Sequence, residues 1–186
     1  MNTLIKSIEE EYRRYKSLAE SALGQVEEGT LSQPGHPGGN SLAVIGWHLS
    51  GNLQSRFTDF LTSDGEKPWR DREEEFAARS VSRAELNEKW ERGWQVLLDT
   101  LVALTDDDLT KSVVIRGRPL FVHEALNRSL AHVSYHVGQI VYVAHMLRGN
   151  DWKYLTIAPG ASAAYNANPA FEKPSEHKQQ LDSSKA

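Results

Sequence analysis

The feature that most constrains this chain is an uninterrupted stretch from Leu120 to Gly149, LFVHEALNRSLAHVSYHVGQIVYVAHMLRG. It follows Pro119, contains no proline and stops at a glycine, so it predicts one long helix. Within it, His132 and His136 are four residues apart, which places their side chains about 40° apart on one helix face. Two neutral imidazole nitrogens placed in this way can converge on one metal ion.

Other polar residues of this predicted helix are sorted by their angle to the histidine pair. Arg128 and Gln139 fall on nearly the same stripe, so we expect them to line the approach to the pair. His123 and His145 each lie nine residues from the nearer member of the pair, about 180° around the helix. They cannot join that face, so a third imidazole must come from another segment.

His48 is the remaining histidine in a regular element, within the apolar pattern SLAVIGWHLSGNLQSRFTDFLTS. A buried histidine needs a polar partner, because burying it unpaired costs roughly 2 kcal/mol or more. The partner could be a carbonyl or a neighbouring side chain, which would make His48 a core residue, or a metal ion. His36 lies in a loop rich in proline and glycine and His177 in a polar tail, and neither position favours a ligand. Together with the pair, His48 would complete a three-nitrogen site with open positions.

The hydrophobic pattern predicts an all-α fold. Four runs with a 3.6-residue period predict helices near residues 3–24, 41–62, 82–104 and 120–148. Ser82 and Glu85 have capping-box spacing at the start of the third run. With no internal repeat, this order predicts a four-helix bundle with long inter-helix connections.

The second and third connections are long enough to cross the bundle. Residues 63–81 form the second, and its Arg70–Glu75 portion is interpreted as a solvated surface with local ion pairs. Residues 110–122 belong to the third and predict either a short hairpin or an extended crossing link. We expect one domain over residues 1–166 and a disordered polar tail over residues 167–186.

The bulk composition argues against several classes of function. A formal charge of −4 and the absence of a basic helix give no reason to expect nucleic acid or an anionic membrane as partner. No apolar run approaches about 20 residues and the N-terminus lacks the apolar core of a secretion signal, so a cytoplasmic location is expected. The chain has no cysteine, so it offers no thiolate as ligand or nucleophile.

Two segments give the chain a resemblance to a known family. VIGWHLSGNLQSR and HVSYHVGQI resemble the DinB-like superfamily of metal-binding four-helix-bundle proteins, which includes thiol-dependent transferases and isomerases. FLTSDGEKPWRDRE and WKYLTIAPGASAAYN are similar to a less characterised bacterial branch, and the likeness covers most of residues 1–166. The resemblance implies the bundle fold, a metal site at His48, His132 and His136, and a tendency to dimerise. Five tryptophans and apolar helix faces also favour a homodimer.

The first functional hypothesis is a metal-dependent enzyme of the thiol S-transferase type, or a hydrolase. A divalent ion on three neutral imidazoles would lower the pKa of a bound thiol or water. Without protein cysteines, the thiol must be a low-molecular-weight cosubstrate that meets a second small molecule. Arg128 could pair with its carboxylate or with a glutamate of another helix. Gln139 could orient a ligand or join two helices, and Asn52, one turn after His48, could line the site.

The second hypothesis is a non-enzymatic dimer whose metal is structural or sensory, with a role in a stress response. It is favoured by the lack of a general base near the histidines in the sequence. A fourth protein ligand would support a structural metal, whereas an open position facing a pocket would support catalysis. Three imidazoles do not identify the ion, which could be zinc, nickel, iron or manganese.

Overall fold

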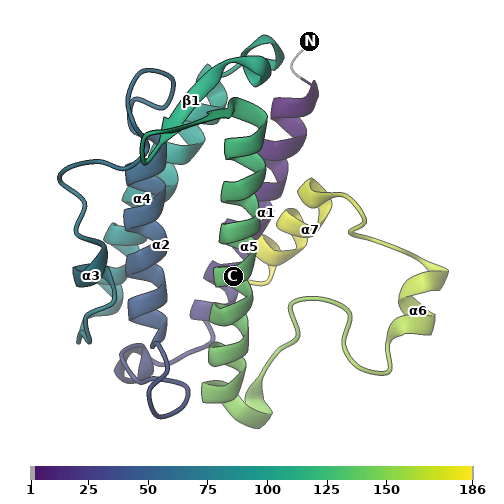
Figure 1. Cartoon of the computed structure of the whole chain (residues 1–186). Helices are drawn as coiled ribbons and strands as arrows, with labels where there is room; N and C mark the ends of the chain where they lie inside the picture. The colour runs from purple at the N-terminus through teal and green to yellow at the C-terminus, as the bar shows by residue number, and fades with distance from the viewer. Residues whose placement is uncertain (1–2, 186) are drawn as a thin grey trace.

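The computed structural model describes residues 3–185 and is mostly helical. Four long helices hold most of the helical residues: α1 (Thr3–Leu23), α2 (Leu42–Phe57), α4 (Arg83–Ala103) and α5 (Val122–Arg148). The shorter elements are α3 (Arg72–Glu75), α6 (Ser162–Ala167), α7 (Pro174–Ser183), three 3₁₀ turns (Glu28–Thr30, Asp106–Thr110 and Gly149–Asp151) and a two-stranded sheet. Figure 1 shows α2 and α5 side by side, with α1 and α4 behind them.

Local sequence signals set the helix ends. The Ser82 hydroxyl accepts a hydrogen bond from the Glu85 N–H, and the Glu85 carboxylate accepts one from the Ser82 N–H, which is the predicted capping box. The second helix ends at Phe57, five residues before the predicted 62. Asp59 has a positive φ of 48°, which a right-handed helix cannot accommodate.

Hydrogen bonds between helix ends define how the chain is routed. Thr100 Oγ1 donates to the Phe57 carbonyl at 3.0 Å, so the C-terminal ends of α2 and α4 meet and the two helices run parallel. Arg83 Nη1 donates to the Leu23 carbonyl at 3.1 Å, so α1 runs antiparallel to α4. The connection over residues 58–82 therefore returns along α2 to the end where α2 begins. This agrees with the prediction that the second connection is long enough to cross the bundle.

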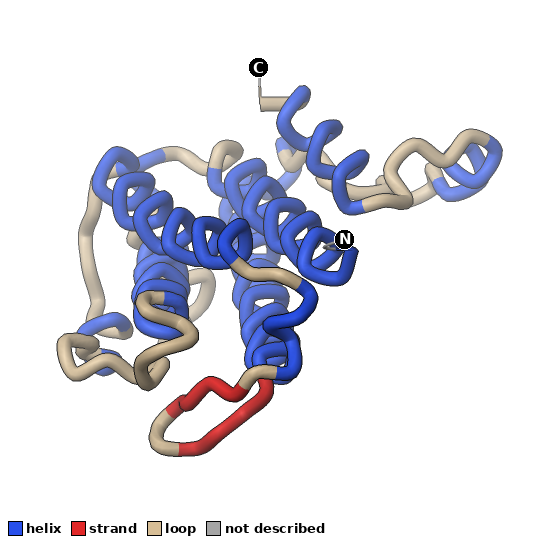
Figure 2. The backbone as a smooth tube through the Cα atoms, turned by 90° about the horizontal axis from the view of Figure 1, so that it is seen from above, coloured by secondary structure: helices blue, strands red, loops and turns tan. Residues whose placement is uncertain are grey.

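The third connection does not cross. Its two strands, β1 (Ser112–Ile115) and β2 (Arg118–Phe121), form an antiparallel hairpin at the end where α4 stops and α5 begins. The hairpin therefore occupies the first residues of the predicted 120–148 helix, and α5 starts two residues later. Figure 2 shows the two red strands beside the long helices.

The hairpin turn is tightly specified. Arg116 and Gly117 both have positive φ, 55° and 71°, as a two-residue type I′ turn requires. The Asp64 carboxylate accepts hydrogen bonds from their backbone N–H groups at 2.8 and 2.7 Å. The turn is thereby joined to the segment that leads from α2 to α3.

One hydrophobic core lies between the long helices. Each contributes a side chain with no measurable exposure, namely Tyr12, Leu49, Trp94 and Ile140. The rings of Tyr12 and Trp94 meet edge to face at a centroid distance of 6.5 Å, a favourable aromatic geometry. The Tyr12 hydroxyl donates to the Leu126 carbonyl at 3.1 Å, which satisfies its polar atom and joins α1 to α5.

The C-terminal segment differs from the expectation of disorder over residues 167–186. Residues 174–183 form α7, which packs against α1, whereas α6 stands away from the helices (Figure 1). Leu181 is buried, and the His177 ring is hydrogen-bonded to the Leu155 carbonyl at 2.8 Å. Ser17 Oγ donates to the Asp182 carboxylate at 2.9 Å. One apolar face and these polar contacts order a segment whose composition is otherwise polar.

Leu181→Ala is expected to lower the free energy of unfolding by about 2 kcal/mol, since it removes a side chain that is 2% exposed. Gln179→Ala, on the exposed face of α7, should change it by less than about 0.5 kcal/mol. Urea unfolding followed by circular dichroism measures both. Equal stabilities for the two variants would mean that α7 does not dock on α1 in solution.

None of the helices within residues 3–185 combines the length and the apolar character needed to cross a membrane.

Candidate metal centre

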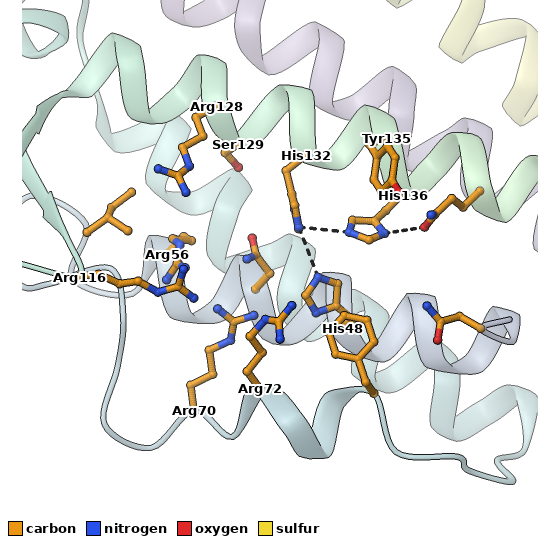
Figure 3. Close-up of a pocket in the computed structure, with 15 residues that line it drawn as sticks. His48, Arg56, Arg70, Arg72, Arg116, Arg128, Ser129, His132, Tyr135 and His136 are labelled. Atoms are coloured by element: carbon orange, nitrogen blue, oxygen red, sulfur yellow. Dashed lines mark hydrogen bonds between the residues drawn. The ribbon is translucent and has the colours of Figure 1, made fainter. Parts of the chain in front are cut away.

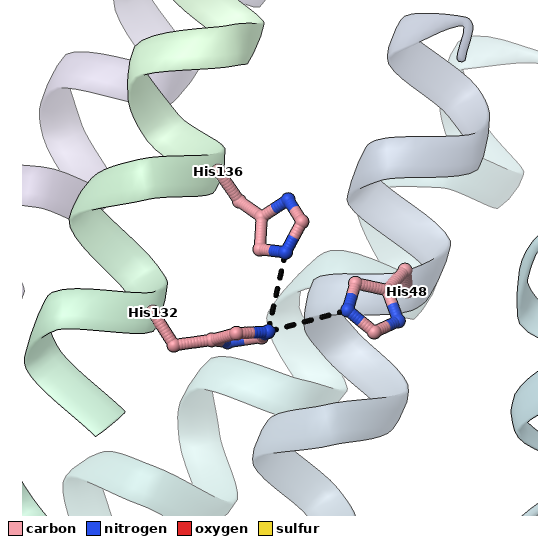
Figure 4. A group of neighbouring side chains, drawn as sticks. All are labelled: His48, His132 and His136. Atoms are coloured by element: carbon pink, nitrogen blue, oxygen red, sulfur yellow. Dashed lines mark hydrogen bonds between the residues drawn. The ribbon is translucent and has the colours of Figure 1, made fainter. Parts of the chain in front are cut away.

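Three histidines meet between α2 and α5, as Figure 4 shows. His48 extends from α2, and His132 and His136 extend from successive turns of α5. The Nε2 atom of His132 lies 3.3 Å from Nε2 of His48 and 3.2 Å from Nε2 of His136. One nitrogen from each ring lies within 4.8 Å of the others. The structure thus brings together the three histidines selected from the sequence.

The spacing of these nitrogens suits a metal ion. Two imidazole nitrogens bound at about 2.0–2.1 Å with a tetrahedral angle between them are about 3.3–3.4 Å apart. The two shortest separations are close to this value. Small adjustments of the rings would therefore allow all three to bind one ion.

Hydrogen bonds on the far side of two rings determine where their lone pairs point. His48 Nδ1 lies 2.9 Å from Oε2 of Glu75, and His136 Nδ1 lies 2.8 Å from Oε1 of Gln139. Because each oxygen accepts, each Nδ1 carries the proton and each Nε2 presents a lone pair. A neutral His132 ring can donate one N–H at most, so it can satisfy the Nε2 lone pair of only one of the other two histidines. A cation would satisfy the lone pairs of all three rings. Orientation of this kind is typical of metal-binding histidines.

Glu75 is itself held in a buried ion pair. Arg70 donates from Nε and Nη2 to the two Glu75 oxygens, both at 2.8 Å. Burial acts to raise the pKa of Glu75, but hydrogen bonds from Arg70 and His48 outweigh it and hold the pKa below its usual value. Gly51 makes room for this carboxylate, since a Cβ there would lie 2.2 Å from Oε1.

The environment keeps His132 and His136 in the neutral form that a metal requires. Burial, reinforced by His136 and His48, lowers the pKa of His132 to about 3. Burial also lowers the pKa of His136, against the hydrogen bond to Gln139. The Nδ1 atom of His132 is buried and makes no hydrogen bond. At neutral pH, protons would therefore not compete with a cation for these two rings.

The histidines form part of the wall of a cavity of about 420 Å³ (Figure 3). Within residues 3–185, no fourth histidine, aspartate or glutamate joins their cluster. A metal held here would thus keep positions open toward the cavity, the arrangement associated with catalytic sites.

The three further candidates from the sequence all line this cavity. The Gln139 side chain is hydrogen-bonded to the His136 ring and so holds that ring in its orientation. Arg128 forms no ion pair within residues 3–185, so the alternative of a salt bridge to another helix is not realised. Asn52 is largely buried and lies one turn beyond His48.

The role of Glu75 was missed from the sequence. The sequence predicts a solvated surface with local ion pairs over Arg70–Glu75. The ion pairs are present and Glu73 and Glu74 are exposed, but Glu75 is only 4% exposed. Asp71 caps the four-residue helix α3 by accepting from the Glu74 N–H at 2.9 Å, and the next residue turns inward. A helix of one turn gives no periodicity to detect, so the signal was the Asp71 cap alone.

Comparison with known proteins supplies a family but no function. A family model described as "Protein of unknown function (DUF1572)" matches residues 1–161. The matched region includes the four long helices, the hairpin and all three histidines. No curated protein and no solved structure matches the chain. The chain therefore belongs to DUF1572, a family of proteins of unknown function.

Proposed function

We propose that this protein is a metal-dependent enzyme of the thiol S-transferase type, built on the four-helix bundle of the DinB-like superfamily. The observation that carries the proposal is the convergence of three Nε2 atoms on one point at the wall of an open cavity. The sequence resemblance of the two histidine segments supports the same assignment. The physiological ion is zinc, nickel, iron or manganese, all of which accept imidazole ligands.

A divalent ion bound by neutral imidazoles supplies Lewis acidity, which lowers the pKa of a bound thiol or water and makes it nucleophilic near neutral pH. The chain supplies orientation: Glu75 and Gln139 hold the rings of His48 and His136 with Nε2 facing inward. Since the chain has no cysteine, the thiol is a cosubstrate. Arg128 is placed to bind a carboxylate of that cosubstrate, and the Asn52 amide to contact it.

The test begins with protein purified without nickel affinity chromatography and analysed for metal. After chelation, each of the four metals is restored separately, and glutathione or free cysteine is offered with monochlorobimane. In the reaction a C–S bond forms, chloride leaves and the thiol proton passes to solvent. We expect a metal-dependent acceleration that His132→Ala abolishes.

A structural or sensory metal in a stress response is the competing function. A protein with that function would bind metal, but no combination of metal and thiol would accelerate the thiol-transfer reaction. The absence of a fourth protein ligand within residues 3–185 favours the enzyme.

We also propose that the protein is a homodimer. On α5, Tyr135, Tyr142 and Met146 share one face and are 64%, 68% and 46% exposed. Burying such a face against a second copy would give an isologous helix-to-helix interface. Light scattering at micromolar concentration should give twice the chain mass, and a monomer would contradict the proposal.

A further inference from the structure

The part of the cavity beside the histidines is lined by arginines. They come from α2, the segment before α3, α3 itself, the hairpin turn and α5: Arg56, Arg70, Arg72, Arg116 and Arg128. Figure 3 shows them grouped to one side of the three imidazoles. Among the described residues that line this cavity, none is an aspartate or a glutamate. The cavity therefore combines a candidate metal centre with a cationic wall.

The carboxylates behind this wall are too few to neutralise it. Glu75 pairs with Arg70, and it also serves His48. Glu66 is shared, because its Oε2 lies 3.0 Å from Arg56 Nη2 and 2.8 Å from Arg116 Nε.

The remaining two arginines have weaker compensation. Arg72 pairs with Glu73, which is 89% exposed, and such a pair is strongly screened by water. Arg128 pairs with no carboxylate within residues 3–185. Five guanidinium groups thus face three carboxylates, which leaves two positive charges uncompensated even without a metal ion.

One unsatisfied donor marks the same place. The Arg70 side chain is 2% exposed, yet its Nη1 makes no hydrogen bond, and the Glu66 carboxylate lies 3.7 Å away. A buried donor without a partner is costly, which favours an acceptor supplied by a ligand. Burial lowers the pKa of Arg56, and the nearby charges of Arg70 and Arg116 lower it further, although Glu66 opposes this.

Contacts with the backbone help to position two members of the cluster, Arg56 and Arg116. Arg116 sits on the hairpin turn that Asp64 fixes through two backbone hydrogen bonds. Arg56 donates from Nη1 to the carbonyl of Gly65 in the same segment. Arginine groups fixed in this way recognise anions with little ordering cost.

We propose that Arg56, Arg70, Arg116 and Arg128 form a subsite for a compact group with two negative charges, either a phosphate or a pair of carboxylates, on the substrate. That its reacting end faces the histidines rests on the proposed function. The charge excess matches a dianion, and a volume of about 420 Å³ suits one small molecule. The formal charge of −4 for the whole chain disfavours a polyanion such as nucleic acid.

The test measures binding of inorganic phosphate, succinate and acetate by calorimetry, on protein with restored metal and on chelated protein. We expect phosphate or succinate, but not the monoanion acetate, to bind both the metal-restored and the chelated protein. The anion that binds more tightly, phosphate or succinate, identifies the charged group of the substrate. Arg128→Gln and Arg116→Gln should each weaken binding about ten-fold or more. Arg118→Gln is the matched control, because Arg118 is exposed on the same hairpin and does not line the cavity.

Failure of this inference is distinguishable from failure of the proposed function. Anion binding that His132→Ala abolishes and Arg128→Gln leaves unchanged would mean coordination to the metal alone, and would overturn the subsite. Equal effects of Arg128→Gln and Arg118→Gln would also overturn it. Anion binding that depends on Arg128 in a protein without thiol-transfer activity would support the subsite and reject the proposed reaction.

Discussion

His132→Ala is expected to lower the affinity for a divalent metal by more than about 100-fold. Loss of a residue that only orients a ligand typically lowers metal affinity by about 10- to 100-fold, and loss of a ligand itself should cost more. The reason is geometric: the His132 Nε2 lies between the other two, at 3.3 and 3.2 Å. Without it, His48 and His136 are left as a two-nitrogen site that does not compete with chelators. Calorimetric titration with zinc and metal analysis after dialysis against a chelator would measure the loss.

His145→Ala is the matched control for this prediction. His145 lies on the same helix, where its ring stacks on Trp152 at 4.9 Å, far around the helix from the cluster. Its removal should leave metal affinity unchanged. The metal-free stability of His132→Ala should change little, since the core forms without the ion. If a variant with alanine at His48, His132 and His136 kept a full equivalent of tightly bound metal, the site would lie elsewhere.

The long helices were predictable because their signals are local. Each has several turns of apolar periodicity, and the Ser82 cap fixed the start of α4 to within one residue. Helix ends that depend on tertiary contacts were harder to predict from the sequence. The hairpin displaces the start of α5, and its turn depends on Asp64, which is 52 residues away from Arg116 in the chain.

The C-terminal helix illustrates the limit of composition. The tail has few apolar residues, and its polarity predicts disorder. Leu181 and His177 nevertheless lie one turn apart and are both buried, with the His177 ring bonded to the Leu155 carbonyl. A docking surface on α1 was needed to give these two residues their role, and no local pattern reveals such a surface.

The candidate metal centre was also predictable only in part. The His132 and His136 pair follows from helix geometry alone, and elimination among the remaining histidines selected His48. The residues that orient the rings were predictable only in part. Gln139 lies one turn from His136 on the same helix, but Glu75, which is bonded to His48, is 27 residues away from it in the sequence. Charge runs of this kind are usually solvated, so only the fold distinguishes Glu75 from its exposed neighbours.

Glu75→Gln is expected to lower metal affinity about 10- to 100-fold without removing a ligand. The amide has nearly the same volume, but it loses the charge that favours the Nδ1 proton of His48 and one of the two acceptors for Arg70. The same change removes the close charged partner of the buried Arg70 guanidinium and leaves it only Glu66, at 3.7 Å, which costs about 3 kcal/mol in the free energy of unfolding. Zinc titration and urea unfolding would measure the two effects separately.

Two further variants separate the role of Glu75 from a general loss of charge. Glu73→Gln removes a carboxylate two residues away whose side chain is 89% exposed, and it should alter neither quantity appreciably. Gly51→Ala keeps Glu75 but introduces a Cβ 2.2 Å from Oε1, which must displace the carboxylate from His48 and Arg70. We therefore expect Gly51→Ala to weaken metal binding although alanine is the better helix former by about 1 kcal/mol. Wild-type zinc affinity in both Glu75→Gln and Gly51→Ala would show that the carboxylate stabilises α3 without orienting His48.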